Sequence, residues 1–215
     1  MELNRTIDHT ILRADATPED IDRLCQEARD YHFYSCCVNS TYVKQVHDRL
    51  QGSDVSTCCV VGFPLGAMAT EAKLAECKTA LEDGADEIDM VINVGRLKAG
   101  QEKEVEEEIR RLKEAVGPDR VLKVIIECCL LSREEKVLAC RLAVKAGADF
   151  VKTSTGFSTG GATAEDVRLM KETVGDACKV KASGGIHSRE EAMEMIEAGA
   201  ERIGASAGIR IVSGD

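Results

Sequence analysis

The chain lacks tryptophan, holds three prolines, and is only 3% aromatic, and it shows no low-complexity segment. With 44% hydrophobic and 31% charged residues among 215, it can bury a sizeable core, so we expect a globular protein. No apolar run approaches the roughly 18 residues that cross a bilayer. The opening MELNRTIDHT has neither the basic start nor the apolar core of a signal peptide. We therefore predict a cytoplasmic protein with no membrane partner.

Positive charge is scarce as well. Twenty-eight lysines and arginines face 38 aspartates and glutamates, which gives a net charge of −10 and argues against nucleic-acid binding. Any anionic ligand must therefore be held by a local pocket. The ten cysteines would suggest a disulfide framework only in a small secreted protein, and no CxxC spacing with matching histidines predicts a zinc site. We interpret them as reduced thiols that fill the core, and we expect no metal.

A partial repeat organises the chain. EDGADEIDMV (82–91), KAGADFVKTS (145–154) and EAGAERIGAS (197–206) share a Gly-Ala-acid-x-apolar pattern. A glycine at this position is typical of the left-handed residue that ends a helix, and the residues after it are typical of a buried parallel strand. The pattern predicts repeated helix-to-strand units.

All such units together give eight candidate strands, at 6–12, 35–39, 56–63, 87–93, 122–127, 150–154, 179–184 and 202–206. Helical composition separates them at 17–29, 40–50, 70–82, 101–116, 132–145, 163–174 and 188–197. Eight alternations in about 215 residues favour a single (β/α)8 TIM barrel of the α/β class with eight parallel strands over a doubly wound sheet. No linker interrupts the series, so we predict one domain over 1–215.

Three consecutive strands carry a lysine where a core residue is expected. Period-two alternation places Lys123, Lys152 and Lys181 on the faces that line the barrel lumen. Lysine is among the residues least often fully buried, so three in one lumen require paired carboxylates or a purpose.

Carboxylates are available for these lysines. The same alternation places Glu87, Asp89 and Asn93 in the lumen, and the first strand adds Asp8. A purely structural ion-pair network is one explanation and stays open. A stability-driven barrel core, however, prefers branched aliphatic layers.

The other explanation is chemical. Two ammonium groups roughly 5 to 6 Å apart repel by about 3 kcal/mol at an effective dielectric near 20, which would leave one lysine partly neutral near pH 7. A neutral lysine can attack a carbonyl and form an imine, while a neighbouring lysine and aspartate pass protons.

The last two predicted strands lead into small residues. SGGIHSREE (183–191) follows strand seven, and IGASAGIRIV (203–212) places Gly204, Ser206 and Gly208 at a short terminal helix. Loops at these two positions are the usual phosphate cradle of such barrels, although glycine in a tight turn is the simpler explanation of each motif alone. A substrate that has both a carbonyl and a phosphate is implied.

The segments that carry these features resemble, in order, those of the deoxyribose-phosphate aldolase family, class I aldolases of the TIM-barrel fold. They are IDHTIL, CVNSTYV, GFPLGAMATEAKLAE, GADEIDMVINVG, KVIIECCLL, GADFVKTSTGFSTGGAT, VKASGGI and RIGASAGI. The resemblance covers essentially the whole chain. VKTSTG followed by KASGG is far more restrictive than either glycine motif.

The resemblance implies roles for five lumen residues. Lys152 matches the Schiff-base lysine, Lys181 the second lysine that perturbs it, and Asp89 the proton-relay acid. Asp8 and Lys123 match the supporting polar network. The implied reaction is reversible cleavage of 2-deoxy-D-ribose 5-phosphate to acetaldehyde and D-glyceraldehyde 3-phosphate, in deoxyribose phosphate catabolism, without metal or cofactor. A homodimer is also implied.

The phosphate side of the substrate is implied to contact Gly156, Ser183, Gly184, Gly185, Gly204 and Ser206. Phe157 and Ala207 stand where some relatives have lysine and serine, which bears on phosphate affinity. The chain stops at IVSGD, where some relatives have a tyrosine-bearing tail, which bears on proton transfer. Cys37, at the end of the second predicted strand, matches a cysteine that lies near the pocket in the family, and we expect no required catalytic role for it.

Rival functions remain at this point. One is another imine-forming aldolase, such as a transaldolase-like or 2-keto-acid enzyme, which would use a larger donor. Another is a non-catalytic phosphosugar-binding barrel, in which Lys152 and Lys181 only neutralise phosphate. An isomerase or synthase on the same scaffold would not need paired lysines with an aspartate.

Overall fold

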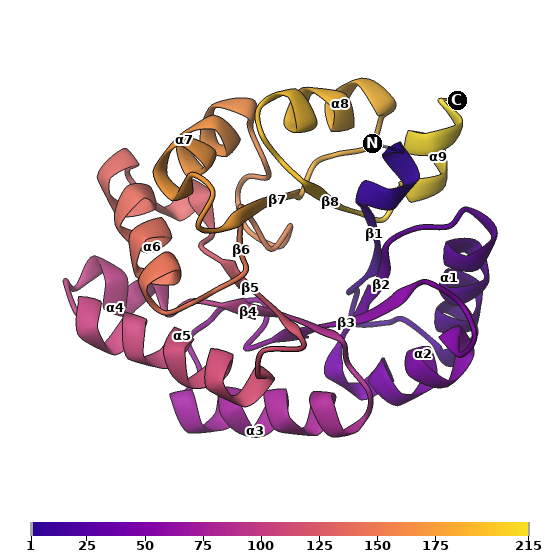
Figure 1. The fold of residues 1–215 in the computed structure, drawn as a ribbon, viewed down its shortest axis with the longest axis horizontal. Helices are drawn as coiled ribbons and strands as arrows, with labels where there is room; N and C mark the ends of the chain where they lie inside the picture. The colour runs from indigo at the N-terminus through magenta and orange to yellow at the C-terminus, as the bar shows by residue number, and fades with distance from the viewer. Residues whose placement is uncertain (1, 215) are drawn as a thin grey trace.

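A computed structural model describes residues 2–214. Its eight strands run parallel and close into a barrel in sequence order, with the first strand hydrogen-bonded to the eighth (Figure 1). The strands are β1 Ile7–Ile11, β2 Ser35–Val38, β3 Ser56–Val61, β4 Glu87–Val91, β5 Val121–Ile125, β6 Phe150–Lys152, β7 Lys179–Ser183 and β8 Arg202–Ala205. The (β/α)8 TIM barrel predicted from the sequence is confirmed, and each strand start lies within one residue of its predicted position.

Helices surround the barrel (Figure 1). They are α1 Pro18–Asp30, α2 Val43–Leu50, α3 Thr70–Glu82, α4 Val94–Lys98, α5 Glu102–Val116, α6 Arg133–Lys145, α7 Ala164–Val174, α8 Arg189–Glu197 and α9 Gly208–Ser213. Three 3-10 turns, η1 Leu3–Thr6, η2 Ser40–Tyr42 and η3 Cys128–Leu130, complete the described elements. None of the helices within residues 2–214 is both long and apolar enough to cross a membrane.

Capping fixes where several helices begin. The Thr17 hydroxyl accepts from the backbone N–H of Asp20, and the Asp20 carboxylate accepts in return from Thr17 N–H, which is a capping box. Ser132 and Ser188 begin α6 and α8 in the same way. Each cap satisfies two of the backbone donors that a helix start leaves unpaired, so the short loops end at defined residues.

The repeat pattern marks helix ends. Gly84, Gly147 and Gly199 follow α3, α6 and α8 and have φ of +101°, +84° and +114°. These angles favour glycine, and the next few residues enter β4, β6 and β8. The helix-to-strand units predicted from the sequence are therefore present.

Alternation along the strands divides side chains between two cores. Val124, Val151 and Val180 face outward into the apolar layer beneath the helices. The intervening residues face the lumen, where Cys37, Cys58 and Val60 form a small separate apolar cluster. Most of the remaining buried polar side chains of the lumen are charged.

One predicted lumen residue lies elsewhere. Asn93 follows β4, and its side-chain oxygen accepts from the backbone N–H of Arg96, so it caps α4 and takes no part in the lumen. The short helix α4 was not predicted. It begins right after a buried strand, and its five residues, VGRLK, are too few for a periodic pattern.

Candidate active site

Six charged side chains from five strands form a closed ring inside the barrel. Opposite charges alternate around it in the order Arg202, Asp8, Lys181, Asp89, Lys123, Glu87 and back to Arg202. None is more than 3% exposed. The ring contains three cations and three carboxylates, so its formal charges balance.

Direct hydrogen bonds join each neighbouring pair. Lys123 Nζ donates to Glu87 Oε2 at 2.5 Å and to Asp89 Oδ1 at 2.8 Å. Lys181 Nζ donates to Asp89 Oδ2 at 2.8 Å and also to Asp8 Oδ2. These are charge-assisted bonds between groups held out of water, which makes their geometry rigid.

Lys152 stands outside this ring. Its Nζ donates to Asp89 Oδ2 at 2.8 Å, the same oxygen that accepts from Lys181. Lys181 pairs with two carboxylates and Lys123 with two close ones and a third at 3.9 Å, whereas Lys152 pairs only with Asp89 among the described residues. With every group ionised, the cluster therefore carries one unmatched positive charge, contributed by Lys152.

The ion pairs determine how the ring titrates. Burial acts to raise the pKa of Asp89, but the ammonium groups of Lys123, Lys152 and Lys181 outweigh it and hold that pKa well below its usual range. Burial acts to lower the pKa of Lys181, but Asp8 and Asp89 outweigh it and raise that pKa. The sequence alone suggests that two lysines repel each other directly. In the structure, Lys152 and Lys181 instead share the carboxylate of Asp89. In this network Lys181 stays charged.

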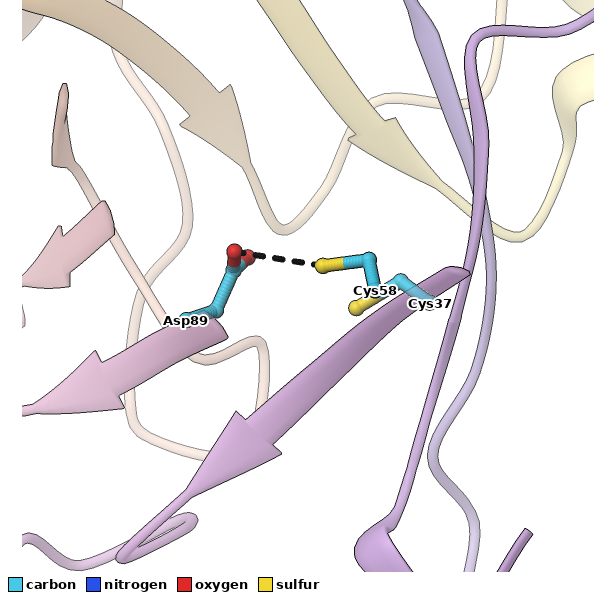
Figure 2. Close-up of side chains that lie close together, drawn as sticks. All are labelled: Cys37, Cys58 and Asp89. Carbon is cyan, nitrogen blue, oxygen red and sulfur yellow. Dashed lines mark hydrogen bonds between the residues drawn. The ribbon is translucent and has the colours of Figure 1, made fainter. Parts of the chain in front are cut away.

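Two thiols lie beside Asp89. Figure 2 shows Cys37 and Cys58 next to its carboxylate, with the Cys58 thiol donating to Asp89 Oδ1 at 3.3 Å. The three potential ligand atoms lie within 4.8 Å of one another. Burial raises the pKa of Cys58 well above its usual value, and both Asp89 oxygens already accept from ammonium groups. We therefore interpret the trio as part of the packed lumen and not as a metal site.

A cavity of about 440 Å³ opens at the carboxyl ends of the strands. Lys152 is the lumen lysine that lines it, while Lys181, Asp89, Asp8 and Lys123 lie beneath. All six residues predicted for the phosphate side also line it: Gly156, Ser183, Gly184, Gly185, Gly204 and Ser206. The cavity thus joins one reactive side chain to a wall of small residues from the loops after β6, β7 and β8.

Close backbone contact shapes that wall. Gly184 has φ of +85°, and a Cβ there would lie 3.1 Å from Gly161 Cα and 3.3 Å from Gly156 Cα. The backbone N–H of Ala162 donates to the Gly184 carbonyl at 2.9 Å. The loops after β6 and β7 can approach this closely only because these positions lack side chains.

Some site residues were missed from the sequence. Arg202 belongs to the ring. It lies two residues before Gly204 on the same strand, so it faces the same side, and this parity was the sequence signal that could have identified it. Arg13 also lines the cavity, but its guanidinium is paired with Asp15 and Asp20. Phe157, predicted to affect phosphate affinity, lines the cavity edge-on to the Phe63 ring, with centroids 5.2 Å apart.

The fold and site together define a class. A (β/α)8 barrel with a lysine at the floor of a glycine-lined cavity, above a buried carboxylate, has the arrangement that imine-forming aldolases require. A family model described as DeoC/LacD family aldolase matches residues 4–214. The chain belongs to this family.

Named relatives agree. The chain is 63% identical over 214 residues to the deoxyribose-phosphate aldolase of Finegoldia magna, covering 100% of both chains. It is 58% identical over 214 residues to that of Brevibacillus brevis, covering 100% of this chain and 96% of the relative. A solved tetrameric deoxyribose phosphate aldolase from Aeropyrum pernix has a TM-score of 0.91 and 35% identity, covering 98% of this chain and 89% of that one.

Proposed function

We propose that the chain is a class I deoxyribose-phosphate aldolase that cleaves 2-deoxy-D-ribose 5-phosphate reversibly to acetaldehyde and D-glyceraldehyde 3-phosphate. The observation that carries the proposal is the position of Lys152. It is the unmatched cation of a buried charge network and the lumen lysine that borders the cavity. Loss of one proton from this cluster leaves balanced charges and an amine that faces the substrate.

The chemistry follows from that placement. The neutral Lys152 Nζ attacks the aldehyde carbon of the open-chain sugar, and the carbinolamine loses water to give an iminium. The iminium draws in the electron pair of the C2–C3 bond as the C3 hydroxyl loses its proton, and glyceraldehyde 3-phosphate leaves. The resulting enamine is protonated at C2, and water releases acetaldehyde. Lys181, hydrogen-bonded to Asp89 beside Lys152, is the group we assign to proton transfer.

The phosphate end of the substrate is assigned to the glycine-rich wall. Gly184, Gly185, Gly204 and Ser206 line the cavity, and small residues there leave backbone N–H groups within reach of an anion. The net charge of −10 on the whole chain makes such a local cradle necessary. Arg13 is already paired with carboxylates, so we assign phosphate affinity chiefly to backbone groups.

Imine trapping tests the function. The protein is incubated with 2-deoxyribose 5-phosphate or acetaldehyde, reduced with sodium borohydride, and digested for peptide mass spectrometry. We expect an N-ethyl group on Lys152. An adduct on Lys181 would reverse the two lysine roles, and capture of a larger donor in preference to acetaldehyde would favour a transaldolase-like enzyme. A folded protein with no adduct would instead support a non-catalytic phosphosugar-binding barrel.

Gly184→Ala tests the phosphate assignment. The added Cβ would press on Gly156 and Gly161 at a positive φ, so we expect the cradle to shift. KM for 2-deoxyribose 5-phosphate should rise by roughly tenfold, equal to about 1.4 kcal/mol of binding. The rate of imine trapping with acetaldehyde, which has no phosphate, should stay within about twofold. An equal loss with both substrates would contradict the assignment.

We further propose that the chain is a homo-oligomer. The relative from Aeropyrum pernix is a tetramer, and a homodimer is our own prediction for this chain. Sedimentation velocity on the purified protein distinguishes monomer, dimer and tetramer by mass.

A further inference from the structure

Arg202 gives the ring one positive charge that does not change with pH. Arg202 Nε donates to Asp8 Oδ1 at 2.9 Å, and its terminal nitrogen donates to Glu87 Oε2. Its guanidinium carbon lies 3.3 Å from the centroid of the Tyr34 ring and 5.7 Å from that of Phe150. A lysine can release a proton, but an arginine in a protein does not, so Arg202 is a permanent positive charge.

We propose that Arg202 is a positioning residue that sets the charge balance of the network and thereby the pH dependence of imine formation in the cavity. The proposal rests on the aldolase function proposed above. Arg202 does not line the cavity, and it acts through two relays that both end at Asp89. One passes through Asp8 and Lys181, and the other through Glu87 and Lys123.

The charge count shows why the arginine matters. Arg202 and three lysines give four positive charges against the three carboxylates of Asp8, Glu87 and Asp89, which leaves an excess of one. Without Arg202 the remaining charges would balance with Lys152 still protonated, and release of its proton would create a net negative charge in a site shielded from water. With Arg202 present, the same release removes the excess.

Other titratable groups face this network. Around Lys152 they are Asp89, Lys181 and the Cys37 thiol. The Cys58 thiol contacts Lys123 Nζ at 3.5 Å, and burial keeps it protonated, so it adds no charge.

Around Arg202 the remaining groups lie at the amino ends of the strands. They are the Tyr34 ring and, beyond Phe150, the exposed Lys179, whose ammonium lies 5.6 Å from the Phe150 centroid. Solvent screens Lys179, whereas the ring members are buried and interact at low dielectric.

Two substitutions that change the charge of the ring in opposite directions test the proposal. A unit charge roughly 10 Å away at an effective dielectric near 20 shifts a titration midpoint by about one pH unit. The measurement is the rate of borohydride trapping with acetaldehyde as a function of pH, from pH 5 to 10. In Arg202→Met the rising limb of this pH profile should therefore move up by about one unit. In Glu87→Gln the limb should move down by a similar amount. In the double variant it should return near its wild-type position.

A merely structural role predicts another pattern, in which both single variants lose amplitude, the limb does not move in opposite directions, and the double variant is worst. That pattern overturns the proposal. Arg202→Lys keeps the charge but loses the fork of donors, so its limb should stay in place while its amplitude falls. If Arg202→Met fails to fold by circular dichroism, Glu87→Gln decides, and no downward shift there overturns the proposal. An absent wild-type adduct on Lys152 would instead overturn the proposed function.

Discussion

Replacing Lys152 by methionine should lower kcat/KM for 2-deoxyribose 5-phosphate by at least roughly 10⁴-fold, because removal of a covalent nucleophile leaves only binding and electrostatic effects. The protein should stay folded. Lys152 is the cation that the ring does not need, so its loss leaves three cations and three carboxylates that still pair with one another. Steady-state kinetics and urea denaturation measure the two effects separately.

Lys145→Met provides the matched control. This lysine is 70% exposed in its side chain, lies at the end of α6, and pairs with Glu106 at the surface. Its loss should change neither kcat/KM nor the denaturation midpoint appreciably, since exposed ion pairs contribute little. If Lys152→Met retained more than a few per cent of activity, the imine would have to form on another amine.

Asp89→Asn should cause the largest loss of stability among single changes in the network. Three ammonium groups donate to this carboxylate, and an amide would leave them with one fewer negative charge among them. Breaking a buried pair by removing one partner costs about 3 to 5 kcal/mol, which urea denaturation at neutral pH measures. Activity should fall by about 10²- to 10⁴-fold as well, since the shared oxygen that aligns Lys152 with Lys181 is lost.

The same variant has a signature in acid. The pKa of Asp89 is lower in the folded protein than in the unfolded chain, so the folded state binds fewer protons. Its contribution to stability is present above the unfolded value near 3.9 and is lost as the pH falls below it. The free energy of unfolding of the wild type should therefore drop more steeply between about pH 5 and pH 3 than that of Asp89→Asn. Parallel curves for the two proteins would exclude Asp89 as the carboxylate that sustains this pH dependence.

Most of the fold follows from local patterns. The Gly-Ala-acid repeat ends helices at Gly84, Gly147 and Gly199 because these positions need a positive φ, and that requirement is encoded locally. The helix α4 was missed because five residues give no periodicity, and Asn93 was misplaced because β4 ends two residues earlier than its apolar run suggests.

The site was only partly predictable from the sequence. Alternation along single strands was enough to place Lys123, Lys152 and Lys181 in the lumen. The face to which a side chain points depends only on its odd or even position within its own strand. The ring required more, because Glu87 and Arg202 are 115 positions apart and meet only through the register and closure of the whole barrel. The excess charge on Lys152 becomes visible only when every partner is known.

The ring also ties the reactive site to the closure of the barrel. Asp8 in β1 and Arg202 in β8 are separated by 194 positions, and their contact closes the network between the first strand and the last. Without β8 the ring lacks Arg202, and Asp8 and Glu87 each lose the guanidinium that joins them. Contacts between residues so far apart in the sequence form slowly, because the entropy cost of closing the long loop between them comes first. The balanced ring therefore exists only once the last strand has paired with the first, so the charge network around Lys152 is a property of the closed barrel and of no smaller part of it.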